Sequence, residues 1–189
     1  EQGLFNATNG TYSVRLPDDS MLITPYDKDR LYVQGEDLVR VKDHMKEKGK
    51  TPSRAVLIHQ RIYRDHPGVK AILVAHPLHL MAFAVTDARF DARTIPESHI
   101  LLRDVEKLPF ETIYRDPHAI SEAITSRSPA LLVENDSIVV TGESLLKAFD
   151  RLEVAEATAA SLYLSRAIGN VVTISDAQIE ALHEAFGLS

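Results

Sequence analysis

The chain has 189 residues, of which 44% are hydrophobic and 25% are charged. These values fit one globular domain with its own hydrophobic core, and they exclude a disordered or fibrous protein. A net charge of −6 argues against a nucleic-acid partner, and the absence of cysteine excludes disulfides and cysteine-bound zinc.

The first third of the chain is expected to form short antiparallel strands. Strand-like runs cover residues 12–16, 21–24 and 30–33, with turn residues at Pro17-Asp18-Asp19 and at Gly35. A meander is the natural interpretation of runs this short.

A helix and a buried strand are predicted next. From Ser53 apolar residues recur at helical spacing, until His66-Pro67-Gly68 ends the run. Residues 69–75 are almost continuously apolar, which predicts a strand buried on both faces. Another helix should follow through residues 81–85.

The section from residue 90 to residue 116 is mixed in character. It indicates only a short strand or loop around Leu101 and another before Tyr114. A helix is predicted over residues 119–126.

The last part of the chain has clearer signals. Residues 130–133 and 138–141 predict a hairpin, and residues 143–168 predict a long helix. Ser175 and Gln178 have the spacing of a capping box for a final helix. Because hairpins outnumber strand-helix-strand units, we expect a single α/β domain over residues 1–189 with a mainly antiparallel sheet.

The protein is expected to be cytoplasmic. No apolar run is long enough to span a bilayer, so no membrane span is predicted. Residues 1–5 also lack the basic segment of a signal peptide.

Several short motifs follow one another along the chain. They are Gly3-Leu4, residues 8–15, Leu22-Ile23-Thr24-Pro25, Pro52-Ser53, His59 with Ile62-Tyr63-Arg64, residues 71–79, and residues 135–140 with Gly142. In this order they resemble the class II aldolase/adducin family, which includes L-fuculose-1-phosphate aldolase. The resemblance implies a central, mainly antiparallel sheet flanked by helices in three α/β/α layers, often assembled as a homotetramer.

The resemblance also implies a chemistry, from which this chain departs. Enzymes of the family hold a divalent metal such as zinc with three histidines, and the metal stabilises an enediolate. Their His-x-His pair is Val74-Ala75-His76 here, their Asn-His-Gly turn is Asn135-Asp136-Ser137, and their glutamate base is Ala55. We therefore expect a pseudoenzyme, with a binding or assembly role and without standard zinc-dependent aldolase activity.

The alternative is a divergent metal-dependent lyase or epimerase acting on a small sugar phosphate. Its metal ligands would be His76, His79 and Asp136, with Glu134 as a substitute for His79. Its base would be Tyr63, His59, or a tyrosine from a neighbouring subunit such as Tyr114. Against this, His76 and His79 are also explained by packing, and an amphipathic helix usually buries residues such as His59 and Tyr63.

A phosphate site is predicted from the same resemblance. The family's Gly-Asn turn is Gly10-Thr11 here, and its Ser-Ser pair is Ser53-Arg54. Thr11, Ser53 and Arg54 are thus the expected substrate or phosphate ligands, because a guanidinium and free backbone N–H groups both attract anions. In place of the family's Thr-Gly stands Tyr26-Asp27, whose carboxylate would repel a phosphate. Glu153 and Glu156 are predicted to be ordinary surface charges.

Overall fold

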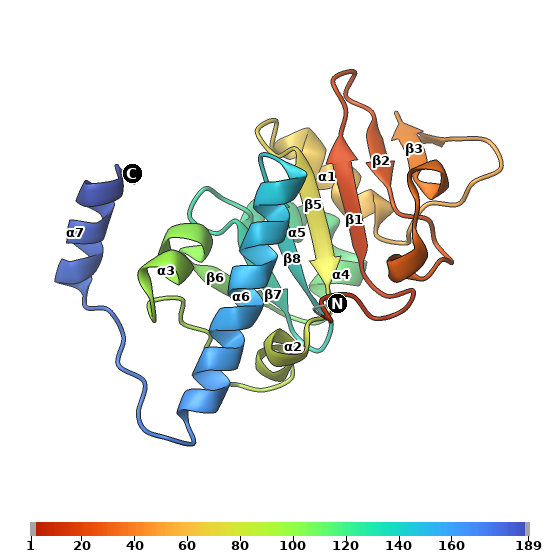
Figure 1. Cartoon of the computed structure of the whole chain (residues 1–189). Helices are drawn as coiled ribbons and strands as arrows, with labels where there is room; N and C mark the ends of the chain where they lie inside the picture. Colours follow the sequence, from red (N-terminus) through yellow and green to blue (C-terminus); the bar gives the residue numbers. More distant parts are fainter. Residues whose placement is uncertain (1–2, 188–189) are drawn as a thin grey trace.

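The computed structural model describes residues 3–187, and its centre is one eight-stranded sheet (Figure 1). The strands are β1 (Thr11–Arg15), β2 (Met21–Ile23), β3 (Val39–Lys42), β4 (Met45–Lys46), β5 (Ala71–Ala75), β6 (Val105–Leu108), β7 (Ala130–Val133) and β8 (Ser137–Gly142). Their order across the sheet is β4-β3-β2-β1-β5-β8-β7-β6. Neighbours are antiparallel except for the parallel pair β6 and β7, which confirms the predicted mainly antiparallel α/β fold.

Helices cover both faces of the sheet and make three layers (Figure 1). They are α1 (Val56–Asp65), α2 (Leu78–Ala84), α3 (Pro96–Leu102), α4 (Thr112–Arg115), α5 (Pro117–Ala123), α6 (Leu145–Ser165) and α7 (Asp176–Phe186). One hydrophobic core joins α2, α3 and α6 to one face, and a second joins α1, α4 and α5 to the other. None of the helices within residues 3–187 is long and apolar enough to cross a membrane.

Strand β5 lies between the two cores. All five of its residues are buried, because it has helices on both faces and a strand on each side. This is the environment that its continuous apolar sequence predicts.

Two predicted segments have a different structure. Residues 30–33 do not form a strand: Arg30–Tyr32 is a 3₁₀ turn, in which the Asp29 carboxylate accepts a hydrogen bond from the Leu31 N–H at 3.0 Å. Leu101 lies in α3, where Pro96 occupies the first turn without the loss of a helical hydrogen bond. The Asp29 cap at Arg30–Tyr32, and the proline in the first turn of α3, outweigh the weak strand pattern.

Glu156 is not an ordinary surface charge. Its carboxylate accepts hydrogen bonds from the backbone N–H groups of His79 and Leu80, both at 3.0 Å, and from His79 Nδ1 at 2.8 Å. These N–H groups lie at the start of α2 and have no partner within the helix. A residue of α6 therefore caps α2 and connects the two helices.

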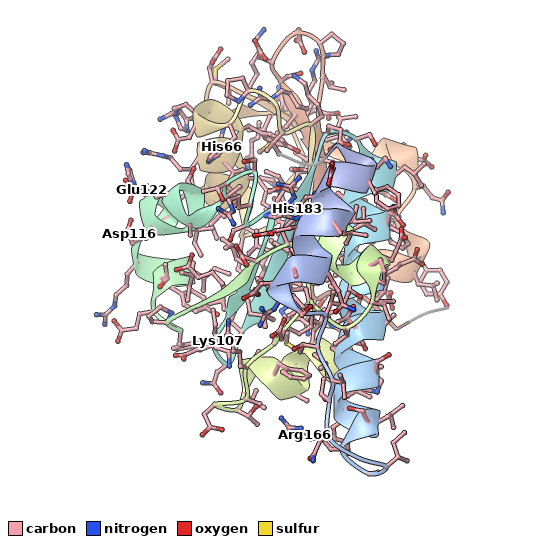
Figure 2. All side chains as sticks on the ribbon, turned by 90° about the vertical axis from the view of Figure 1, so that its left-hand side faces the viewer. His66, Lys107, Asp116, Glu122, Arg166 and His183 are labelled. Carbon is pink, nitrogen blue, oxygen red and sulfur yellow. The ribbon has the colours of Figure 1, made fainter. Side chains whose placement is uncertain are left out.

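The last helix, α7, is attached by few contacts. The predicted capping box of Ser175 and Gln178 is confirmed, but α7 has no buried residue. Arg93 forms an ion pair with Asp176 at 3.2 Å, and His99 Nε2 lies 2.9 Å from His183 Nε2 with the two rings stacked. His183, labelled in Figure 2, therefore lies on the face of α7 that contacts α3.

A buried polar network connects α1 to the sheet. Ser13 Oγ on β1 lies 2.7 Å from His59 Nδ1 and 2.8 Å from the Tyr63 hydroxyl. Burial lowers the pKa of His59 to about 3 and raises the pKa of Tyr63. Both residues are therefore neutral structural groups beneath the sheet, as the packing interpretation predicts.

The neutral state of His59 predicts loss of stability in acid. His59 takes up a proton near pH 6.5 in the unfolded chain and only near pH 3 in the folded one, so its contribution is lost as the pH falls through this window. We expect the uptake of this proton by the unfolded chain to lower the free energy of unfolding by up to about 1.4 kcal/mol for each unit by which the pH falls. The free energy of unfolding, measured with urea at several values between pH 6.5 and 5, should change less steeply with pH in His59→Leu than in wild type.

The exposed His118 on α5 provides a matched control for this experiment. His118→Gln should keep the wild-type slope. An unchanged slope in His59→Leu would contradict the assignment.

Candidate functional site

A cleft of about 570 Å³ opens where the central strands of the sheet end. It is lined by Thr8, Asn9, Gly10, Thr11, Tyr26, Asp27, Arg30, Ser53, Arg54, Ala55, Ile58, Val74, His76, Ile113, Tyr114 and Asp136. Sheet register brings these segments together. Thr11 at the start of β1 pairs with Val74 near the end of β5, and Ala75 pairs with Ile138 just after the turn between β7 and β8.

A larger depression of about 730 Å³ lies beside β6. Several of its charged groups are already bonded within the protein: Arg93 pairs with Asp91 at 2.9 Å, and Lys107 donates to the carbonyls of Phe83 and Thr86 at 2.8 and 2.7 Å. The smaller cleft, in contrast, collects residues of several sequence motifs. We therefore take the smaller cleft as the candidate site.

The predicted phosphate ligands meet in this cleft. Thr11 Oγ1 and Ser53 Oγ lie 2.5 Å apart and are both buried. Arg54 is exposed, and its guanidinium carbon lies 5.6 Å from the centre of the Tyr26 ring. The hydroxyls thus lie at the base of the wall and the Arg54 cation lies at its rim.

Tyr114, Asp136 and His76 form a second polar group. The Tyr114 hydroxyl donates to Asp136 Oδ1 at 2.5 Å, and Ser137 Oγ donates to Asp136 Oδ2 at 2.7 Å. The hydrogen bond to Asp136 raises the pKa of Tyr114, whereas burial lowers the pKa of His76. His76 Nδ1 is buried without a hydrogen-bond partner among residues 3–187.

Tyr114 reaches the cleft from α4 of the same chain. The sequence suggests that Tyr114 would enter the site from a neighbouring subunit. In the structure Tyr114 lines the cleft of its own chain. The other two proposed bases, His59 and Tyr63, do not line the cleft, and both contact Ser13 in the buried network instead.

The predicted metal ligands are not brought together. His76 and Asp136 line the cleft, but His79 does not, and its Nδ1 is bonded to Glu156. Within residues 3–187 no three His, Asp or Glu side chains are grouped so that they could hold a metal ion. Val74 and Ala55, at the positions of a family ligand and of the family base, line the cleft with side chains that can neither bind a metal nor accept a proton. The residues present do not fit the three-ligand site of the family.

Arg30 is a cleft residue that the sequence did not reveal. Its side chain lines the cleft although the residue is only 9% exposed. Arg30 Nε donates to the Gly10 carbonyl at 2.7 Å. The expected strand over residues 30–33 hid this role, since the inward orientation of Arg30 depends on the 3₁₀ turn.

Comparisons with known proteins agree with this fold. The chain matches the family model of the Class II Aldolase and Adducin N-terminal domain over residues 1–163. It is 31% identical over 166 residues to the 3-oxo-tetronate 4-phosphate decarboxylase of Haemophilus influenzae, which covers 84% of this chain and 79% of that protein.

Solved structures give the same result. The crystal structure of YgbL from Escherichia coli superposes with a TM-score of 0.83 at 26% identity, over 95% of this chain and 89% of that one. The L-fuculose-1-phosphate aldolase of Thermus thermophilus superposes with a TM-score of 0.75 at 26% identity, over 87% of each chain.

The contact between Tyr114 and Asp136 predicts a change in phenol ionisation. Asp136→Asn removes the negative charge that opposes formation of tyrosinate, so the pKa of Tyr114 should fall toward its ordinary value. Titration of the absorbance near 295 nm should detect this fall. In a Tyr114→Phe background the Asp136→Asn change should have no effect, and an equal shift there would show that another tyrosine is responsible.

Proposed function

The chain belongs to the class II aldolase and adducin family, and from this premise we propose that it binds a small phosphorylated sugar or sugar acid in the cleft. We propose further that it does so without the three-histidine metal chemistry of the family's aldolases. The observation that carries the proposal is the meeting of Thr11, Ser53 and Arg54 in one cleft with Tyr114, Asp136 and His76. Hydroxyls and a guanidinium suit the acidic groups of such a ligand, and proton-transfer groups suit its reacting carbon.

The argument against standard aldolase activity rests on the substituted residues. An aldol cycle needs a base that exchanges a proton with a substrate carbon, and the side chain of Ala55 has no basic group. The metal-dependent alternative would need a third ligand beside His76 and Asp136, which residues 3–187 do not group there. The relatives are named as enzymes, so the pseudoenzyme interpretation draws on these substitutions alone.

A second candidate function is decarboxylation of a phosphorylated 3-oxo sugar acid. It is favoured by the name of the Haemophilus influenzae relative and by the geometry of Tyr114. When a 3-oxo acid loses carbon dioxide, the electrons of the broken C–C bond form an enolate, which then needs a proton on carbon. The Tyr114 phenol lines the cleft and is protonated at neutral pH, so this residue would supply the proton.

Further properties are proposed on the family resemblance or on sequence. We propose a homotetramer, a cytoplasmic location and no nucleic-acid partner. A single domain over residues 1–189 is proposed as well. The family model matches residues 1–163, and α7 contacts this part through Asp176 and His183.

Ligand binding after chelation tests the leading proposal. Protein treated with EDTA, with its metal content measured by elemental analysis, should bind D-erythrose 4-phosphate with a Kd on the order of 10 μM to 1 mM. Isothermal titration calorimetry measures this value, and D-erythrose is the control without phosphate. Near-stoichiometric zinc that is lost in His76→Ala, together with loss of binding after chelation, would overturn the metal-free proposal.

Product analysis tests the second candidate. Incubation with 3-oxo-tetronate 4-phosphate should release carbon dioxide faster than buffer does, and Tyr114→Phe should slow this release by about 100-fold. The exposed Tyr163 on α6 offers a control, since Tyr163→Phe should leave the rate unchanged. Equal release of carbon dioxide with protein and with buffer would overturn the decarboxylation candidate, and the leading proposal would not be affected.

A further inference from the structure

Arg30 and Arg54 both line the cleft, Arg30 as a buried side chain and Arg54 as an exposed one. Resting on the proposed function, we propose that Arg30 binds the phosphate of the ligand and Arg54 binds a carboxylate. The cleft would then select phosphorylated sugar acids over sugar phosphates that lack a carboxylate. This assigns a substrate class to the site and a binding role to a residue outside the family's motifs.

Arg30 is a buried cation without a direct ion pair among the described residues, and the Asp29 carboxylate acts on it only at longer range. Its Nε and one terminal nitrogen donate to the carbonyls of Gly10 and Lys28, at 2.7 and 2.5 Å. The other terminal nitrogen makes no hydrogen bond within residues 3–187, and Arg30 forms no ion pair there. A desolvated cation is costly unless it is paired, so an anion in the cleft would complete this site.

The two carbonyl bonds also fix the position of Arg30. A guanidinium is planar, and two of its donors are held by the backbone, so the free edge keeps one orientation before any ligand arrives. Burial lowers the pKa of Arg30, but an arginine stays charged far above neutral pH. Thr11 and Ser53 lie in the same cleft and offer hydroxyls to the same anion.

Arg54 serves a different part of the cleft. Its guanidinium lies over the ring of Tyr26, and its charge lowers the pKa of Tyr114 against the larger effect of Asp136. Arg54 and Tyr114 both line the cleft. A carboxylate bound by Arg54 would therefore lie in the same cleft as the proton-transfer group.

The carboxylates around the cleft do not neutralise these arginines by direct contact. Asp136 is bonded to Tyr114 and Ser137, and Asp29 accepts from the Leu31 N–H. Asp27 is exposed at the rim, where water screens its charge. Two arginines and two aspartates line the cleft, so selection depends on local pairing more than on net charge.

Two four-carbon probes test the proposal. D-Erythronate 4-phosphate carries a phosphate and a carboxylate, whereas D-erythrose 4-phosphate carries the phosphate alone. Calorimetry on wild-type protein should show at least about tenfold tighter binding of the first probe. Arg30→Gln should weaken both probes by about tenfold or more, and Arg54→Gln should abolish the preference between them.

The exposed Arg166 at the end of α6 provides the charge-matched control (Figure 2). Arg166→Gln should bind both probes as wild type does. If Arg30→Gln does not fold, as judged by thermal melting, Arg30→Lys takes its place. Lysine keeps the charge but lacks the planar fork of donors that reaches two carbonyls and an anion in fixed directions, so both probes should still bind several-fold more weakly.

The outcomes separate this inference from the proposed function. Wild-type affinity of Arg30→Gln, or of Arg30→Lys where it is used, overturns the phosphate assignment while ligand binding stands. A preference retained in Arg54→Gln overturns the carboxylate assignment. Failure of wild-type protein to bind either probe would overturn the proposed function itself.

Discussion

The register between β1, β5 and β8 is the constraint on which the site depends. Thr11 pairs with Val74, and Ala75 pairs with Ile138, so the start of one strand, the end of the next and a hairpin turn meet at one edge. A slip of β5 by one residue would exchange its two faces, so Val74 would leave the face that it shares with its partner Thr11. The sheet therefore holds the cleft in place without any ligand, and the flanking loops add the charged groups.

Much of the fold is visible in the sequence because its signals are local. The apolar run of β5, the hairpin of β7 and β8 and the capping box of α7 each depend on neighbouring residues, and each is confirmed. One error occurs where a contact from elsewhere adds to a local cap. The Arg30–Tyr32 turn is stabilised by a bond from Arg30 to Gly10, twenty residues away, and no periodic pattern could reveal it.

The site shows the same division. Motif order alone groups Thr11, Ser53 and Arg54, because each lies in a segment whose place in the fold the resemblance implies. The spacing of His76 and His79 suggests a shared ligand set, yet Glu156, 77 residues further along, bonds His79 instead. Pairings between distant helices depend on how the helices cross. Sequence spacing contains no such information.

The burial of Val74 makes the replacement of a histidine at this position difficult to reverse. At the position where the family implies a metal-binding histidine, the valine is 5% exposed and packs in the core shared with α1, α4 and α5. A return to histidine would bury an imidazole among apolar side chains before any other ligand had been restored, so the single step would carry a penalty without a benefit. Evolution can therefore pass through this replacement far more easily in one direction than in the other.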